Sequence, residues 1–279
     1  MTVADTHETD RLTLEAEVWQ DEARKLIRLA APAPTARCLD ACCGPLGALA
    51  ALAAAVPRGQ VVGLEADDEL ADDARQAAAA RRLDAVTIVT GDLLDYRPPR
   101  LFELVYMRFA PASMGTPGRR ILEALRRLCL PGGAVLMHEP FGAFHYAGAP
   151  SSALERLLAL ATAAYHAECV DLHAGRQLTS RLAGAGLTDV VERRARVALP
   201  PGHPYLRLPL LLADALEDDI IQLRTVAADD LRALRGAAEH EIAAPSLRAT
   251  TFELVGAVGR VPLISRPAGR HLVPAAATA

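Results

Sequence analysis

The sequence lacks long apolar runs and is almost without lysine. Its longest apolar candidate, residues 206–216, is interrupted by charged side chains and is shorter than the roughly 18 residues of a membrane span. Lys25 is the only lysine among 30 basic residues, and the net charge is -4 with no basic block. The first ten residues are polar and acidic, which is not typical of a secretory signal. We therefore expect a soluble, cytoplasmic protein without membrane or nucleic-acid partners.

Cysteine is also scarce and unpaired in pattern. The five cysteines are Cys38, Cys42, Cys43, Cys129 and Cys169, and no C-x-x-C pair is repeated. An odd number with this spacing excludes a disulfide framework for a chain of this size. We expect buried, reduced thiols and no metal site.

Strand-length apolar runs alternate with helical stretches from about residue 36 onward. The apolar runs cover residues 61–64, 86–89, 104–107, 134–137 and 190–199. The helical stretches between them cover residues 46–56, 68–82, 117–129 and 174–185. This β-α-β-α rhythm predicts an α/β domain with a mainly parallel sheet covered by helices on both faces.

Helical segments are also expected outside this alternation. Residues 9–30 read as one amphipathic helix, in which Leu12, Val18, Leu26 and Leu29 share a face. An A-P-A-P-T linker follows, so we predict an N-terminal helical lid over residues 1–35 and one domain over residues 36–279.

The second half of the chain contains further helices. Residues 151–170 predict a long helix capped by serine, and residues 204–218 and 227–241 predict two more. We therefore expect helical insertions near residues 145–172 and 203–245. They either pack on the sheet as ordinary core helices, or form a lid over an apolar substrate or a dimer surface. The stretch T-F-E-L-V-G-A-V-G-R-V-P predicts a late strand.

The stretch C-L-D-A-C-C-G-P-L-G-A-L-A-A-L, from Cys38 to Leu52, reads as a strand, a glycine turn and a helix. Glycine lets backbone N–H groups approach a ligand, and the following helix adds a positive dipole end. Glu65 ends the next strand, twenty-one residues after Gly44, where a carboxylate can accept hydrogen bonds from two ribose hydroxyls. These features predict a nucleotide-like ligand at the carboxyl ends of the strands.

Five motifs between about residues 36 and 140 together resemble the class I S-adenosylmethionine-dependent methyltransferases. They are the glycine loop, V-V-G-L-E-A-D, G-D-L-L-D, F-E-L-V-Y-M-R-F-A and L-C-L-P-G-G-A-V-L-M-H-E-P. The stretches R-L-T-L-E-A-E-V-W and G-R-Q-L-T-S-R-L-A-G-A-G-L-T-D-V also resemble a bacterial small-molecule branch of that family. The resemblance implies a Rossmann-like sheet of seven strands, in the order 3-2-1-4-5-7-6, with the seventh strand antiparallel.

The same resemblance implies S-adenosylmethionine as cofactor and S-adenosylhomocysteine as its product. The implied cofactor residues are Asp40, Cys42 and Gly44 for the amino-acid part, Glu65 with Ala66 for the ribose, Asp92 with Leu93 for the adenine, and Met107 near the sulfonium. Arg108 lies beside Met107, toward the substrate. Family members commonly read D-x-G-C-G-x-G, whereas this chain has Cys42 at the first glycine and Leu46 at the third.

Candidate catalytic residues follow the fifth strand, in H-E-P-F-G-A-F-H-Y. We expect His138, Glu139 and His145 to face the substrate, and His138 or His145 to act as general base. The alternatives stay open: each histidine is a structural residue, Arg108 is a surface arginine, or the transfer needs only proximity and alignment.

These observations predict methyl transfer to a small-molecule acceptor, polyketide-like or aromatic, in natural-product metabolism, by a protein that is a possible homodimer. Three other functions are kept. The first is an enzyme that binds S-adenosylmethionine but catalyses a cyclisation or rearrangement. The second is a non-catalytic binding protein, and the third is a nicotinamide-dependent oxidoreductase, which the missing G-x-G-x-x-G disfavours.

Overall fold

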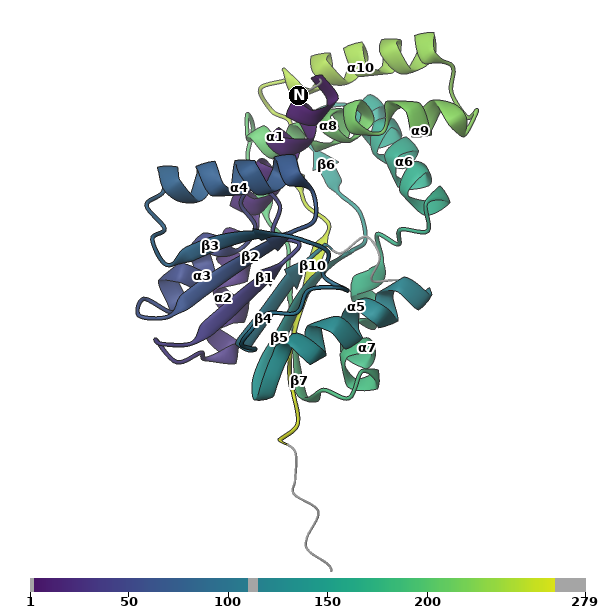
Figure 1. Ribbon diagram of the computed structural model, residues 1–279. Coiled ribbons are helices and arrows are strands. Elements are labelled where there is room, and N and C mark those ends of the chain that lie inside the picture. Colours follow the sequence, from purple (N-terminus) through teal and green to yellow (C-terminus); the bar gives the residue numbers. More distant parts are fainter. Residues whose placement is uncertain (1–2, 110–114, 264–279) are drawn as a thin grey trace, which may run out of the picture.

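The computed structural model describes residues 3–109 and 115–263, which form a twisted central sheet flanked by helices (Figure 1). The seven strands of this sheet are β1 (Arg37–Ala41), β2 (Gln60–Glu65), β3 (Val86–Thr90), β4 (Phe102–Arg108), β5 (Cys129–Phe141), β7 (Thr188–Ala195) and β10 (Glu253–Arg260). Their order is β3-β2-β1-β4-β5-β10-β7, and β10 runs antiparallel to both neighbours. The predicted fold class and strand order are confirmed.

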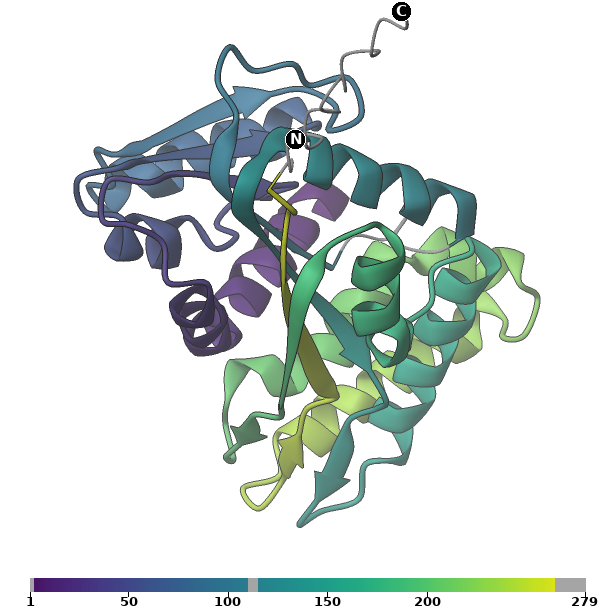
Figure 2. The ribbon, with the colours of Figure 1, turned by 90° about the horizontal axis from the view of Figure 1, so that it is seen from below.

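Two apolar layers bury the faces of the sheet. In β4, Val105 and Met107 pack in the layer that includes α5 (Gly115–Leu128) and α7 (Leu178–Gly184). Leu104 and Tyr106 pack in the opposite layer, with α2 (Gln20–Ala30) and α3 (Leu49–Ala55). Figure 2 shows α2 and α5 on opposite sides of the sheet. This double burial explains why the strands read as nearly continuous apolar runs.

The N-terminal helical segment breaks at Trp19, where a single helix was predicted. It forms α1 (Val3–Val18) and α2, and the indole of Trp19 is fully buried, 5.2 Å from the ring of Phe252. The buried face of α2 runs through Ala23, Leu26, Ile27 and Ala30, so the predicted common face is wrong at Leu29, which is 46% exposed. No helix of the described part of the chain is long and apolar enough to cross a membrane.

A helical cap lies beyond the carboxyl ends of the parallel strands (Figure 1). It contains α6 (Ser152–Ala167), α8 (Leu208–Ala215), α9 (Glu217–Gln222) and α10 (Ala228–Ile242), which share an apolar core. A small antiparallel sheet of β6 (His145–Ala147), β9 (Arg248–Thr250) and β8 (Ala198–Leu199) joins it. β6 and β9 were not predicted, because three residues carry no periodicity. β8 falls at the end of the apolar run predicted over residues 190–199, which the structure divides between β7 and β8.

The N-terminus of α6 is capped differently from the prediction. The Ser151 side chain does not bond the helix backbone, and its hydroxyl donates instead to Glu155, at 2.9 Å. Glu241 from α10 accepts hydrogen bonds from the backbone N–H groups of Ala153 and Leu154, both at 3.0 Å. The N–H groups of the first helical turn have no partner within the helix, and a carboxylate is a favourable acceptor for them. This contact therefore connects α10 to α6.

Candidate active site

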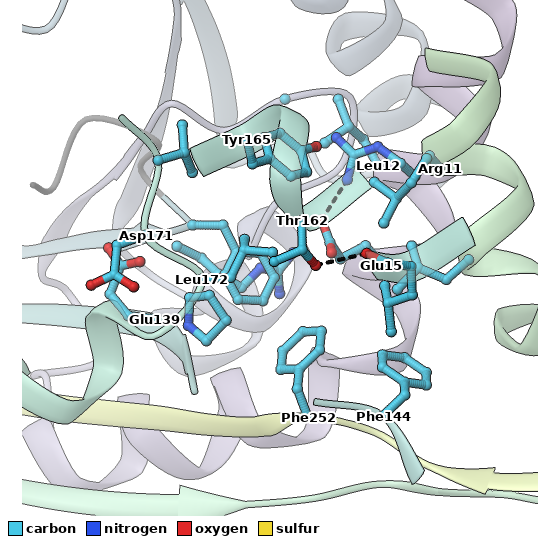
Figure 3. Close-up of a pocket in the computed structure, with 18 of the residues that line it drawn as sticks. Arg11, Leu12, Glu15, Glu139, Phe144, Thr162, Tyr165, Asp171, Leu172 and Phe252 are labelled. Atoms are coloured by element: carbon cyan, nitrogen blue, oxygen red, sulfur yellow. Dashed lines mark hydrogen bonds and ion pairs between the residues drawn. The ribbon is translucent and has the colours of Figure 1, made fainter. Parts of the chain in front are cut away.

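A cavity of about 900 Å³ lies between the sheet and the cap. Its floor comes from the loop after β1 and from the ends of β2, β4 and β5, and its roof from α1, α6 and α8. A crevice beyond the carboxyl ends of parallel strands is the usual binding place in this type of sheet. Figure 3 shows part of the lining.

The structure brings seven of the predicted site residues to this cavity and leaves five outside its lining. Those that line it are Asp40, Cys42, Gly44, Glu65, Arg108, Glu139 and His145. Those that do not are Ala66, Asp92, Leu93, Met107 and His138.

The loop after β1 turns through left-handed backbone at three positions. Cys42, Gly44 and Gly47 have φ angles of 56°, 54° and 47°. A Cβ on Gly47 would lie 2.5 Å from the Asp40 Oδ2 atom and 2.5 Å from the Cys43 carbonyl oxygen, so only glycine fits there. Leu46 stands at the third glycine position of the family pattern. The glycine requirement falls one residue later, and Leu46 is buried.

Glu65 fastens this loop to the end of β2. One carboxylate oxygen accepts a hydrogen bond from the Gly44 N–H and the other from the Ala66 N–H, each at 2.8 Å. The side chain lines the cavity and is 9% exposed. Ala66 therefore contributes its backbone to this arrangement although it lies outside the cavity lining.

Asp40 lies beneath the same loop. Its Oδ2 atom accepts a hydrogen bond of 2.6 Å from the Ala48 N–H, and the residue is 2% exposed. Burial raises the pKa of Asp40 to about 7, while the bond from Ala48 and the charge of Arg108 act in the opposite direction. A cationic ligand next to this carboxyl group would therefore stabilise its ionised form and lower its pKa.

The thiol of Cys42 stays protonated near neutral pH. Cys42 is exposed at the cavity, although buried thiols were expected. Desolvation by the surrounding loop, followed by the charges of Glu65, Asp40 and Asp92, raises the pKa of Cys42. The side chain lines the cavity where many relatives by motif have glycine.

The residues predicted for adenine and sulfonium lie elsewhere. Asp92 is exposed after β3, and its Oδ1 atom accepts from the Leu94 N–H at 2.6 Å, which forms a local turn. Leu93 and Met107 are buried in the apolar layer beneath α5, with 6% and 1% exposure. The roles of these three residues stay predictions.

His138 does not face the cavity, contrary to expectation. Its Nδ1 atom lies 2.9 Å from the Tyr106 hydroxyl, and a Cβ on Gly256 would lie 2.5 Å from its Nε2 atom. Burial, together with the charges of Arg108 and Arg193, lowers the pKa of His138 to about 3. The ring is therefore neutral and enclosed, because β5 points this position toward the α2 layer rather than the cavity.

Two other histidines line the cavity. His145, in β6, is exposed, as is His173, just before η1 (Ala174–Gln177). The Nδ1 atom of His173 accepts a hydrogen bond of 3.0 Å from the Gly142 N–H, so its neutral ring carries the proton on Nε2. Glu139, also predicted to face the substrate, lines the cavity and is 3% exposed.

Aromatic side chains gather at this cavity although they are few in the chain. Six of the eleven aromatic residues line it. Phe109, Phe144, Tyr146 and Phe252, here called the aromatic wall, contact one another at ring-centroid distances of 5.7 to 6.0 Å. Figure 3 shows Phe144 and Phe252 across the cavity from Thr162. Spacing along the sequence gave no sign of this wall, because its members come from three distant segments.

The cavity lining carries more negative than positive charge. Six carboxylates line it, namely Glu15, Asp40, Glu65, Glu139, Glu155 and Asp171, against two arginines, Arg11 and Arg108. Figure 3 places Glu139 and Asp171 at one end of the cavity. Such a lining attracts cations and repels anions.

The first helix closes the cavity above the glycine loop. Leu12 Cδ1 is the nearest atom to a Cβ built on Gly44, at 3.9 Å. Arg11 forms an ion pair with Glu15 at 3.3 Å. Glu15 also accepts a hydrogen bond of 3.2 Å from the hydroxyl of Tyr205, in the short helix η2 (Pro204–Arg207) that precedes α8. This arrangement is consistent with the predicted lid.

Comparison with known proteins agrees with the fold. Residues 38–133 match the family model of a methyltransferase domain. No curated protein matches the chain significantly. The YcgJ protein of Bacillus subtilis superposes with a TM-score of 0.55 at 13% identity, covering 87% of this chain and 99% of that one. A putative methyltransferase of Bacillus halodurans gives 0.53 at 16% identity, with the same coverage.

A third solved structure carries ligands. It is phosphoethanolamine N-methyltransferase 2 of Haemonchus contortus, in complex with phosphomonomethylethanolamine and S-adenosylhomocysteine. It superposes with a TM-score of 0.54 at 15% identity over 90% of this chain, which spans 57% of its length.

At these identities the solved structures establish a shared fold. The fold is that of the class I S-adenosylmethionine-dependent methyltransferases, with a helical cap. Together with the matched segment, it confirms the resemblance to that family, and the bacterial small-molecule branch stays a prediction.

Proposed function

We propose that this protein is an S-adenosylmethionine-dependent methyltransferase that methylates a small-molecule acceptor inside the cavity. One observation carries the proposal. The glycine loop of the methyltransferase domain and the aromatic wall line the same cavity of about 900 Å³. The cofactor and the acceptor would therefore lie side by side in one cavity, as a direct transfer between two bound molecules requires. The predicted setting in natural-product metabolism is part of this proposal.

The residues of the loop fit the cofactor. A Cβ on Gly44 would meet only Leu12 at 3.9 Å, so the backbone there is accessible from the cavity. Glu65 accepts hydrogen bonds from the N–H groups of Gly44, Ala66 and Asp67, and a carboxylate has about four acceptor positions, so one remains for a ribose hydroxyl. Asp40 and the N–H groups of the loop would hold the amino-acid part.

The cofactor, when bound, supplies a methyl group on a positively charged sulfur. The chain encloses the acceptor, excludes water and aligns the accepting atom. The aromatic wall holds the apolar body of the acceptor. Where the acceptor must lose a proton, we assign His145 as the base, because it lines the cavity and His138 does not.

Substitution of Cys42 tests whether its side chain weakens cofactor binding by the loop. Cys42→Gly removes a Cβ from the cavity and suits the φ angle of 56°. We expect it to lower the Kd for S-adenosylhomocysteine at least threefold in calorimetric titration. Cys42→Ser keeps the Cβ and serves as the control, with a Kd near wild type. Equal affinities of the glycine and serine variants would show that the side chain does not crowd the ligand.

The charge of the lining predicts the charge of the acceptor. Tryptamine, tryptophol and indole-3-acetate share one ring system and carry an ammonium, a hydroxyl and a carboxylate. With saturating S-adenosylhomocysteine, we expect tryptamine to bind at least tenfold more tightly than indole-3-acetate, and tryptophol to lie between them. Glu139→Gln and Asp171→Asn should each reduce the ratio between the affinities for tryptamine and indole-3-acetate. Tightest binding of the carboxylate would contradict this prediction.

Product analysis tests the reaction. The protein is incubated with S-adenosylmethionine and a panel of aromatic amines and phenols, and the masses of the products are measured by mass spectrometry. We expect at least one product heavier by one methyl group, with an equal amount of S-adenosylhomocysteine. A product of unchanged mass would instead support a cyclising or rearranging enzyme. Tight cofactor binding with no product from any acceptor would support a binding protein.

A further inference from the structure

One face of α6 lines the cavity over most of the length of this helix. The residues of this face are Glu155, Leu158, Ala159, Thr162 and Tyr165, which follow one another at the spacing of a helix face. A helix rises 1.5 Å per residue, so the distance along its axis from Glu155 to Tyr165 is about 15 Å. The cavity is therefore elongated along α6.

The two ends of α6 lie at different places in the molecule. The chain leaves α6 toward the carboxyl end of β5, where the Gly142 N–H donates to Nδ1 of His173 at 3.0 Å. The first turn of α6 lies in the cap, where Glu241 of α10 binds the Ala153 N–H, and α10 is on the side of the cap away from the sheet (Figure 1). The cavity face of α6 therefore leads from the sheet, which carries the glycine loop, into the cap.

The aromatic wall also connects the sheet to the cap. Phe109 directly follows β4, and its ring lies 6.0 Å from that of Phe252. Phe252 contacts Phe144 at 5.7 Å, and Phe144 contacts Tyr146 at 6.0 Å. Tyr146 packs against the apolar core of the cap. The four rings thus form a row, and Figure 3 shows two of them, Phe144 and Phe252, across the cavity from Thr162 of α6.

The cap end of this groove carries a carboxylate. Glu155 lines the cavity and accepts a hydrogen bond of 2.9 Å from the Ser151 hydroxyl, and a carboxylate has about four acceptor positions. The two arginines of the described cavity lining, Arg11 and Arg108, come from α1 and β4 and not from the cap. A carboxylate in such surroundings complements an ammonium group and repels an anion.

The middle of the groove is apolar and open. Leu158 and Ala159 line it from α6, and Leu208 and Leu212 line it from α8. Ala159 is exposed at the cavity and has the smallest of these side chains. A ligand that reaches Glu155 from the glycine loop therefore has to pass Ala159, with apolar side chains around it.

We propose that the acceptor is an elongated, apolar molecule that lies between α6 and the aromatic wall, extends past Ala159, and ends in an ammonium group that Glu155 binds. The inference rests on the proposed function and names the class of its acceptor. The methylated atom lies at the sheet end of the groove, beside the cofactor, and the ammonium lies at the cap end.

Three ligands that share one aromatic amine test the proposal. Benzylamine is short, 4-phenylbenzylamine is longer by one ring, and 4,4′-bis(aminomethyl)biphenyl adds an ammonium at the far end of that ring. Each is titrated calorimetrically into protein saturated with S-adenosylhomocysteine. We expect affinity to rise at least tenfold from benzylamine to 4-phenylbenzylamine, and at least threefold again to the diamine.

Two substitutions test the length and the charge separately. Ala159→Phe should weaken both biphenyl ligands at least tenfold, because the added ring occupies the groove, and leave benzylamine within twofold of wild type. Its matched control is Ala163→Phe, on α6 but exposed outside the cavity lining, which should change none of the three. Glu155→Gln should remove the advantage of the diamine over 4-phenylbenzylamine. The control for charge is Glu123→Gln, at a side chain 58% exposed on α5, which should keep that advantage.

The contrary outcomes separate this proposal from the proposed function. Unchanged binding of the biphenyl ligands to Ala159→Phe, or an equal loss for all three ligands, would overturn the proposal. An advantage of the diamine that persists in Glu155→Gln would overturn it too. If Ala159→Phe does not fold, Ala159→Leu decides by the same comparison. Wild-type protein that binds S-adenosylhomocysteine but none of the three ligands would overturn this proposal alone, whereas failure to bind S-adenosylhomocysteine would overturn the proposed function.

Discussion

Replacing Gly47 by alanine should damage both the fold and the ligand loop. A Cβ there would lie 2.5 Å from the Cys43 carbonyl oxygen and 2.5 Å from Asp40 Oδ2, and the φ angle is 47°. Left-handed backbone costs a residue with a Cβ roughly 1–2 kcal/mol, and overpacking typically adds 1–3 kcal/mol. We expect Gly47→Ala to lower the free energy of unfolding by about 2–5 kcal/mol, measured by urea denaturation.

Gly44→Ala is the matched control for this prediction. Its φ angle is 54°, but the added Cβ would meet only Leu12 at 3.9 Å. It should therefore cost about 1–2 kcal/mol, the conformational part alone. Where Gly47→Ala still folds, S-adenosylhomocysteine should bind at least tenfold more weakly than to wild type, because Asp40 and the Ala48 N–H are displaced. Equal stability of the two variants would show that the close contacts at Gly47 can relax.

Glu65→Ala should weaken S-adenosylhomocysteine by more than 1 kcal/mol in calorimetric titration. Two effects combine. The variant loses the acceptor for the ribose, and it releases the Gly44 and Ala66 N–H groups that Glu65 now binds at 2.8 Å. Hydrogen bonds to charged groups are worth roughly 1.5–3 kcal/mol each.

Two variants make the Glu65 result specific. Glu65→Gln keeps one acceptor oxygen and should lose less affinity than Glu65→Ala. Glu69→Ala removes the same charge from an exposed site on α4 (Asp68–Ala80) and should bind like wild type. A loss of affinity in Glu69→Ala equal to that in Glu65→Ala would mean that net charge alone explains the effect.

The mainly parallel sheet could be predicted because it depends on patterns that are local in the sequence, whereas its strand order was implied by the resemblance to the methyltransferase family. Each strand of the parallel part is a short apolar run followed by a helical stretch, and this alternation permits few topologies. The glycine loop and Glu65 follow from the same logic, since both lie at strand ends. Their contact through the Gly44 N–H was not foreseen, because it depends on the side-chain direction.

Other parts depend on contacts that spacing does not encode. His138, in β5, and Tyr146, in β6, are only eight residues apart in the sequence. His138 is nevertheless buried against Gly256, whereas Tyr146 is part of the aromatic wall. The cap of α6 comes from Glu241, 88 residues beyond Ala153, rather than from Ser151. Distant partners of this kind cannot be identified from periodicity or from local capping preferences.

Calorimetric titration of the wild-type protein with S-adenosylhomocysteine tests the central claim most directly. The claim is that the loop with Cys42, Gly44 and Gly47 still binds the cofactor. We expect one site per chain with a micromolar Kd, and competition by S-adenosylmethionine for the same site. Absence of binding heat and of any rise in Tm at millimolar ligand would contradict the claim.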